Sequence, residues 1–103
     1  MPRKNYTVAE IKKLIQPVAA RYEVERVFLF GSYARGDATP SSDIDIRIDN
    51  GAIQDYFELS GFHQELESTF LESVDLLTTG SLESNFLSRI ADEEVLLYER
   101  SQH

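Results

Sequence analysis

The sequence predicts one small domain over residues 1–103, of the α/β (α+β) class, with a mixed sheet of about four strands and helices packed on it. Three observations lead to this prediction. Apolar residues recur with helical spacing near the start of the chain, a short apolar run ends in Gly31-Ser32, and a later segment alternates strictly between isoleucine and charged residues. A chain of 103 residues fits one domain and leaves no room for two.

The first predicted element is a helix that starts near Thr7. Thr7 and Glu10 have the spacing of a capping box, in which each side chain bonds the backbone of the other residue. Pro17 lies inside the pattern and removes a backbone donor, so we expect a kink or a shortened helix there. The residues with the helical apolar spacing are Val8, Ile11, Leu14, Ile15, Val18 and Tyr22.

Two predicted strands follow, separated by a turn and a loop. The apolar run Arg26 to Phe30 indicates a buried strand, and Gly31-Ser32 then leads into a short helix over Tyr33 to Arg35. Gly36 to Ser42 has the composition of a loop. In Asp43 to Asp49 (DIDIRID) the three isoleucines share one face of a strand, and the charged residues share the other.

The second half of the chain predicts two more helices and two more strands. Asn50-Gly51 marks a turn, and Ala52 to Glu72 is predicted to be helical with a break near Ser60-Gly61. Its expected buried residues are Ile53, Phe57, Phe62, Leu66 and Phe70. A strand over Val74 to Thr79 and a helix over Ser81 to Ala91, capped by Ser81, come next, and Val95 to Tyr98 is either an edge strand or a docked tail.

Composition bounds the classes of function. The chain has no cysteine, which rules out disulfides and thiolate zinc sites. Met1 to Glu10 is polar and no apolar run is long enough to cross a membrane, so we expect a soluble, cytoplasmic protein. A net charge of −8 argues against direct binding of nucleic acid. It suits a carboxylate metal site, a basic protein partner, or solubility alone.

Asp43 and Asp45 are the first candidate site residues. Residues two apart on a strand point to the same face, with Cα atoms about 6.6 Å apart, so their carboxylates can converge on one or two cations. Oxygen ligands favour Mg²⁺ or Mn²⁺, and Mg²⁺ characteristically combines one or two carboxylates with substrate phosphates. Without a cation the like charges would repel each other.

Gly31 and Ser32 are the candidate phosphate-binding residues. A glycine lets the backbone approach a phosphate closely, helix amides face the anion, and the Ser32 hydroxyl can donate as well. Arg35 can add a bidentate contact to the polyphosphate. Together with the aspartates, this spacing predicts a site for a metal-bound nucleoside triphosphate. The alternative is a surface hairpin with aspartates at a strand edge.

Leu29 to Asp37 (LFGSYARGD) and Ser42 to Ile46 (SDIDI) resemble the signature of the DNA polymerase β-like nucleotidyltransferase superfamily. Length and layout resemble the minimal nucleotidyltransferases (MNT), the antitoxin half of HEPN–MNT toxin–antitoxin pairs. The resemblance implies a nucleotidyltransferase fold, ATP as substrate, and transfer of AMP to a tyrosine hydroxyl of a cognate HEPN ribonuclease, which AMP silences. It also implies that Asp75 is a third carboxylate, a metal ligand or general base for the acceptor hydroxyl.

Arg47 departs from the family pattern, which is commonly apolar at this position. Alternation places it on the face of Asp43 and Asp45, where it either contacts phosphate or pairs with Asp49. Two other functions stay open: an antitoxin that neutralises its partner by contact without catalysis, and a nucleotidyltransferase acting on RNA or a small molecule. The sequence also leaves open a homo- or hetero-oligomer.

Overall fold

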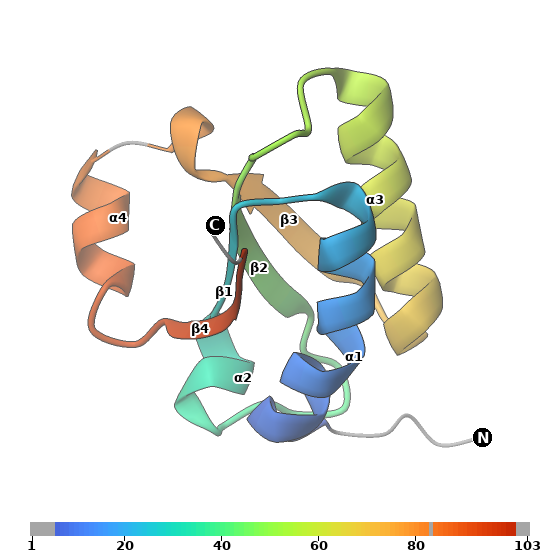
Figure 1. The fold of residues 1–103 in the computed structure, drawn as a ribbon. Helices are drawn as coiled ribbons and strands as arrows, with labels where there is room; N and C mark the ends of the chain where they lie inside the picture. The colour runs from blue at the N-terminus through green and yellow to red at the C-terminus, as the bar shows by residue number, and fades with distance from the viewer. Residues whose placement is uncertain (1–5, 83, 101–103) are drawn as a thin grey trace.

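The computed structural model describes residues 6–82 and 84–100. In those residues, helices and strands follow the predicted order, and they form the predicted mixed sheet with helices packed on it (Figure 1). The elements are α1 (Val8–Tyr22), β1 (Arg26–Phe30), α2 (Gly31–Arg35), β2 (Ile44–Asp49), α3 (Tyr56–Phe70), β3 (Val74–Thr78), the 3₁₀ turn η1 (Thr79–Ser81), α4 (Ser84–Ile90) and β4 (Val95–Glu99). The predicted fold class is therefore confirmed.

The strands lie in the order β3-β2-β1-β4. β1 runs antiparallel to both of its neighbours, whereas β2 and β3 run parallel. In this register Phe30 lies opposite Asp45 on one side, and Asp45 lies opposite Asp75 on the other. The sheet thus joins the end of β1, which leads into Gly31, to the start of β2 and β3.

The two faces of the sheet differ. Helices α1 and α3 pack together on one face, and α4 lies on the other (Figure 1). The predicted alternation of β2 is confirmed, because Ile44, Ile46 and Ile48 are fully buried in the core beneath α1 and α3. On the opposite face the ring of Phe86 in α4 meets Phe30 edge-on, with centroids 6.0 Å apart. The charged side of β2 therefore lies on the less covered face.

Helix α1 continues through Pro17 to Tyr22, so the predicted shortening is wrong. The capping box of Thr7 and Glu10 is present as predicted. Pro17 is exposed, while Ile15 and Val18 on either side are buried. Packing of this apolar stripe on the sheet offsets the hydrogen bond that proline removes.

Helix α3 begins later than predicted and has no break. It starts at Tyr56 because the Asp55 carboxylate accepts a hydrogen bond from the Glu58 amide, at 2.8 Å. The Phe57 side chain is 89% exposed, so its predicted burial is wrong, and it lies in the first turn on the outward side. Gly61 continues the helix and lets it approach α1, since a Cβ there would lie 3.2 Å from the Tyr22 hydroxyl.

The last predicted helix is shorter than expected. Thr79–Ser81 forms a 3₁₀ turn, and the Ser81 hydroxyl bonds the Thr78 carbonyl at 2.9 Å rather than capping α4. Val95–Glu99 pairs with β1, so the edge-strand alternative is confirmed.

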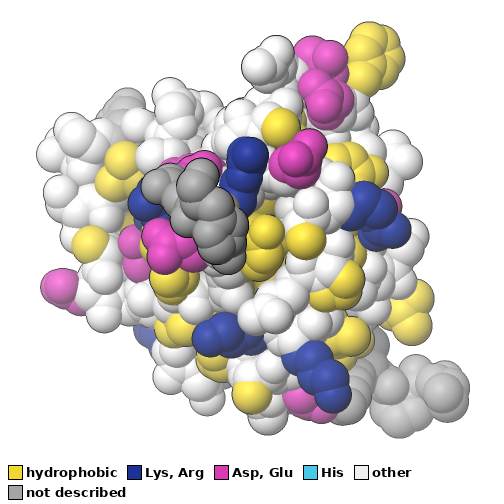
Figure 2. Space-filling model, in the orientation of Figure 1, with side chains coloured by type: hydrophobic (Ala, Val, Ile, Leu, Met, Phe, Trp, Pro, Cys, Tyr) yellow, Lys and Arg dark blue, Asp and Glu magenta, His cyan; other side chains and the backbone are white. Residues whose placement is uncertain are grey.

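The surface matches the acidic composition. On the face in Figure 2, lysine and arginine side chains are scattered among acidic ones rather than gathered into a stripe. Apolar side chains protrude where α3 begins, and Tyr56 and Phe57 are the most exposed large ones there. Within the described residues, no helix is long and apolar enough to cross a membrane.

Candidate active site

The turn after β1 brings backbone directly against a carboxylate. Gly31 has φ +73°, in the left-handed region that a residue with a side chain rarely adopts. A Cβ at Gly31 would overlap the Asp45 carboxylate and would lie 3.0 Å from its Cγ. Glycine at this position therefore lets the Asp45 carboxylate lie directly against the Gly31 backbone at the start of α2, with no side chain between them.

Three carboxylates gather at the same end of the sheet. Asp45 on β2 is half-buried and lies opposite Asp75 on β3, while Asp43 immediately precedes β2. Asp43 and Asp75 are exposed. The structure thus places the three predicted carboxylates together. Their binding of a metal or nucleotide stays a prediction.

The electrostatic environment of Asp45 disfavours its charged form. Burial, the neighbouring carboxylates Asp75 and Asp43, and more weakly Glu93 raise the pKa of Asp45 to about 6, while Arg35 acts in the opposite direction. In the described residues Asp45 has no ion pair or hydrogen bond to relieve this. Such a carboxylate is well suited to a cationic ligand, because a cation removes the repulsion that raises its pKa.

The donor set fits a hard divalent cation shared with a ligand. All three side chains offer only oxygen, which Mg²⁺ and Mn²⁺ prefer. Within residues 6–82 and 84–100, no three acidic or histidine side chains converge closely enough to enclose a cation by themselves. Mg²⁺ usually takes part of its coordination shell from substrate phosphates, so a metal at these carboxylates would depend on the bound nucleotide.

Ser32 and Arg35 lie on α2, beside Gly31. In the part of the chain that the structure describes, the Ser32 hydroxyl makes no hydrogen bond, so it can donate to a ligand. Arg35 is half-exposed and contacts Asp37 at 3.3 Å and Glu93 at 3.3 Å. Its predicted phosphate contact is not tested by this geometry, but its guanidinium is already held by carboxylates.

Arg47 takes a structural role that neither sequence hypothesis described in full. Its guanidinium donates to both oxygens of Glu94, at 2.7 and 3.2 Å, and to the Thr79 hydroxyl at 2.6 Å. It also lies over the Phe28 ring, 4.0 Å from the centroid. The predicted pairing with Asp49 is also present, as a longer ion pair at 3.6 Å. Arg47 is thus buried and paired.

Glu93 and Glu94 are the residues that sequence reasoning missed. They lie in the turn between α4 and β4, and Glu93 reaches the Gly31 amide while Glu94 pairs with Arg47. The only signal in the sequence is the acidic run Asp92-Glu93-Glu94. Without the sheet order, nothing in that run links it to β1 or β2.

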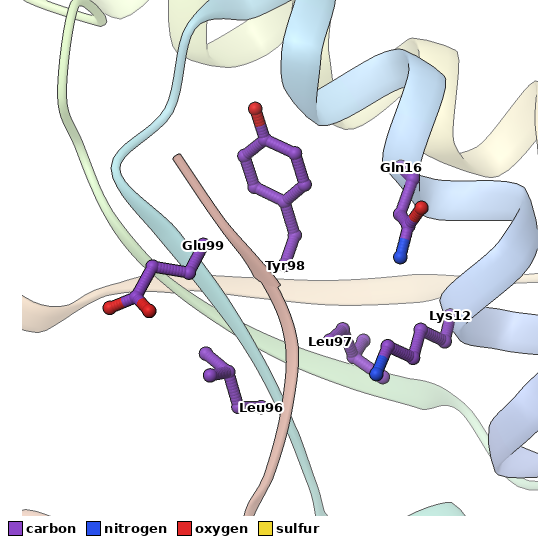
Figure 3. Close-up of a pocket in the computed structure, with 6 residues that line it drawn as sticks. All are labelled: Lys12, Gln16, Leu96, Leu97, Tyr98 and Glu99. Carbon is purple, nitrogen blue, oxygen red and sulfur yellow. The ribbon is translucent and has the colours of Figure 1, made fainter. Parts of the chain in front are cut away.

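A separate surface hollow lies away from these carboxylates. A pocket of about 320 Å³ opens between α1 and β4 (Figure 3), and it is lined by Lys12 and Gln16 of α1 and by Leu96 to Glu99 of β4. None of the predicted site residues lines it. The carboxylates and the Gly31 turn, rather than this hollow, identify the site.

Comparison with known proteins identifies relatives over most of the chain. Residues 12–103 match the family model described as polymerase beta, nucleotidyltransferase. MJ0435 of Methanocaldococcus jannaschii, provisionally named a protein adenylyltransferase, is 36% identical over 85% of this chain and 95% of its own. The protein adenylyltransferase MntA of Thermococcus cleftensis is 30% identical over 86% of this chain and 94% of its own.

Solved structures share the fold. A toxin–antitoxin crystal structure with AMP-PNP has a TM-score of 0.74 and 23% identity, covering 86% of this chain and 73% of that chain. An MNT antitoxin in complex with tri-AMPylated HEPN toxin from Shewanella oneidensis has a TM-score of 0.69 and 20% identity, covering 91% and 74%. With the family match over nine-tenths of its length, the chain belongs to the polymerase beta nucleotidyltransferase family.

Proposed function

We propose that this chain is an antitoxin that transfers AMP from ATP to a tyrosine hydroxyl of a cognate HEPN ribonuclease toxin and so neutralises it. One observation carries the proposal: the Gly31 turn lies directly against the Asp45 carboxylate, with Asp75 opposite on the next strand. A turn suited to binding phosphate and a carboxylate suited to binding a cation are thus adjacent, as nucleotidyl transfer requires.

The relatives support the acceptor and the partner. Curated relatives of nearly the same length carry the name protein adenylyltransferase, and one structural neighbour is an MNT antitoxin bound to an AMPylated HEPN toxin. The scattered basic side chains on the face in Figure 2 give no support to an RNA acceptor. A protein acceptor is therefore favoured.

The proposed ligands follow from the positions of the side chains. Gly31, Ser32 and Arg35 would bind the triphosphate, and Asp43, Asp45 and Asp75 would hold Mg²⁺ or Mn²⁺. When bound, the cation would neutralise charge on the triphosphate and make the α-phosphorus a better electrophile. Because metal ligands must be deprotonated, Asp45 has to lose its proton before it can serve.

The reaction joins the acceptor oxygen to the α-phosphorus of ATP. The tyrosine oxygen attacks that phosphorus, the bond to the bridging oxygen breaks, and pyrophosphate leaves with the bonding electrons. Asp75, exposed at the edge of the site, accepts the phenolic proton as general base. The products are tyrosyl-AMP on the toxin and pyrophosphate.

The test is a transfer assay with the full chain, the cognate HEPN protein, Mg²⁺ and ATP labelled at the α-phosphate. Label should appear on the HEPN tyrosine, its ribonuclease activity should fall, and Asp43→Asn with Asp45→Asn should abolish both effects. Labelling that persists in the double variant would overturn the proposal. Loss of labelling with full neutralisation would instead establish an antitoxin that acts by contact alone.

A further inference from the structure

A carboxylate from the far end of the chain lies in the proposed phosphate site. Glu93 comes from the turn between α4 and β4. Its Oε1 accepts hydrogen bonds from the Gly31 amide at 3.4 Å and from Arg35 Nη1 at 3.3 Å, and its Oε2 accepts from the same nitrogen at 3.4 Å. Two of the donors proposed to bind the triphosphate, the Gly31 amide and the Arg35 guanidinium, are thus occupied by an anionic side chain of the same protein.

Glu93 imitates a phosphate in both charge and contacts. A carboxylate and a phosphate oxygen are both anionic acceptors, and both are bound by backbone amides and by arginine forks. The single Gly31 N–H cannot donate a strong hydrogen bond to Glu93 and to a phosphate oxygen at the same time. The negative charge of Glu93 also adds to the field at Asp45, which works against a second anion in the site.

We propose that Glu93 holds the place of a phosphate in the nucleotide-free protein and swings out when the triphosphate binds, so that it sets the ATP affinity of the site. This inference rests on the proposed function, since it assumes that the Gly31 turn and Arg35 bind the triphosphate. Glu93 is thereby a competitor built into the chain rather than a group that acts on the reacting atoms.

The surroundings of Glu93 allow this movement without rebuilding the fold. Its contacts are long, its side chain is 30% exposed, and Arg35 is 47% exposed. The neighbouring Glu94 is anchored, because its side chain is only 16% exposed and its carboxylate pairs with Arg47 at 2.7 Å. The backbone of the turn is therefore held in place while the Glu93 side chain is free to rotate towards solvent.

Calorimetric titration of the full chain with Mg²⁺–ATP, in the absence of acceptor, tests the inference. Glu93→Gln removes the charge. Glu93→Asp keeps the charge but shortens the side chain by one carbon–carbon bond, about 1.5 Å, which is enough to break contacts that are already long. Asp92→Asn is the matched control, because Asp92 is exposed in the same turn and, within the described residues, contacts neither donor.

Both Glu93 variants should bind Mg²⁺–ATP more tightly than the wild type, by about ten-fold for Glu93→Gln, equivalent to about 1.4 kcal/mol. Inorganic triphosphate with Mg²⁺ should show the same gain, since the competition concerns the phosphate contacts. Asp92→Asn should bind within about two-fold of the wild type, as expected for a screened surface charge.

Each other outcome has a definite meaning. If Glu93→Gln binds ATP as the wild type does, or more weakly, Glu93 supports the site instead of competing for it, and the inference is wrong. If Glu93→Asp matches the wild type while Glu93→Gln gains affinity, charge alone acts and displacement is wrong. If the wild type and every variant fail to bind Mg²⁺–ATP, the proposed function itself fails.

Discussion

Asp45 and Arg47 lie two residues apart on the same face of β2, yet their environments are opposite. Arg47 is 7% exposed, and its guanidinium is satisfied by Glu94, Thr79 and the Phe28 ring. Asp45 has further carboxylates as neighbours, and burial and these charges raise its pKa to about 6. The charge of Arg47 is neutralised by groups of the same chain, whereas the charge of Asp45 needs a cationic ligand to be neutralised.

On this one strand, Arg47 serves the stability of the fold and Asp45 serves the proposed reaction. A buried charge that is paired contributes to the packing of the native state, because breaking the pair leaves its partner uncompensated. A cluster of like charges opposes folding and is retained where a ligand supplies the opposite charge. We therefore expect substitutions at the two positions to have opposite signatures in activity and stability.

The largest expected effect is on transfer by Asp45→Asn. Removing a metal-binding carboxylate should lower the rate of AMP transfer roughly a thousand-fold, since a bound cation contributes several kcal/mol to the transition state. The free energy of unfolding should stay equal or rise, because a repulsive charge is removed. Single-turnover transfer and urea unfolding of the same preparation measure the two quantities. If Asp45→Asn lowers the free energy of unfolding but leaves the transfer rate unchanged, Asp45 serves stability and not transfer.

The next effect is on stability at the other position. Arg47→Met leaves the largely buried Glu94 carboxylate unpaired and should lower the free energy of unfolding by about 3 kcal/mol. Replacing Glu94 by methionine as well should recover most of this loss. The transfer rate per folded molecule should stay within about three-fold of the wild type, a change of less than 1 kcal/mol. No recovery in the double variant would mean that the ion pair is not the stabilising contact.

Two glycines with positive φ sharpen the comparison further. Gly31 and Gly36 both have left-handed backbones, at φ +73° and +84°, but a Cβ at Gly36 has nothing within 4 Å. Alanine at either position should cost about 1 kcal/mol of stability from the backbone. Only Gly31→Ala should also displace the Asp45 carboxylate and lower transfer, by about a hundred-fold. Equal transfer rates in the two variants would show that the contact at Gly31 is unimportant.

The smallest effect is the pH dependence of stability in the metal-free protein. The pKa of Asp45 is about 6 in the folded state, above its ordinary value of 3.8. The stability that the protonated form provides is therefore complete below pH 3.8 and is lost as pH rises through about 6. Urea unfolding between pH about 4 and about 7 should show the wild type losing stability relative to Asp45→Asn. A difference that is constant with pH would contradict the raised pKa.

Local patterns predicted much of the fold. The alternation of β2 depends only on the period of a strand, so the buried isoleucines could be identified without partners. The capping box of Thr7 and Glu10 is equally local. The misses at Pro17, Gly61 and Phe57 arise because packing between α1, α3 and the sheet decides which local preference prevails.

The site was predictable where its residues are close in sequence. One antiparallel pair, β1 and β2, carries Gly31, Ser32, Asp43 and Asp45 at or near its strand ends. Their spacing in the sequence therefore predicts that they lie close together. Asp75 required the family resemblance, because its pairing with Asp45 depends on a parallel crossover. Glu93 and Glu94 could not be found, since their contacts with Gly31 and Arg47 span 62 and 47 residues.

The most direct test of this account compares two variants of the same strand. Equal amounts of folded Asp45→Asn protein and of the Arg47→Met, Glu94→Met double variant are incubated with Mg²⁺, ATP and the cognate HEPN protein. The AMP content of the HEPN protein is then measured by intact mass spectrometry. We expect no AMP on the HEPN protein with the first variant and wild-type AMP content with the second. AMP transfer by Asp45→Asn at the wild-type level would contradict this expectation.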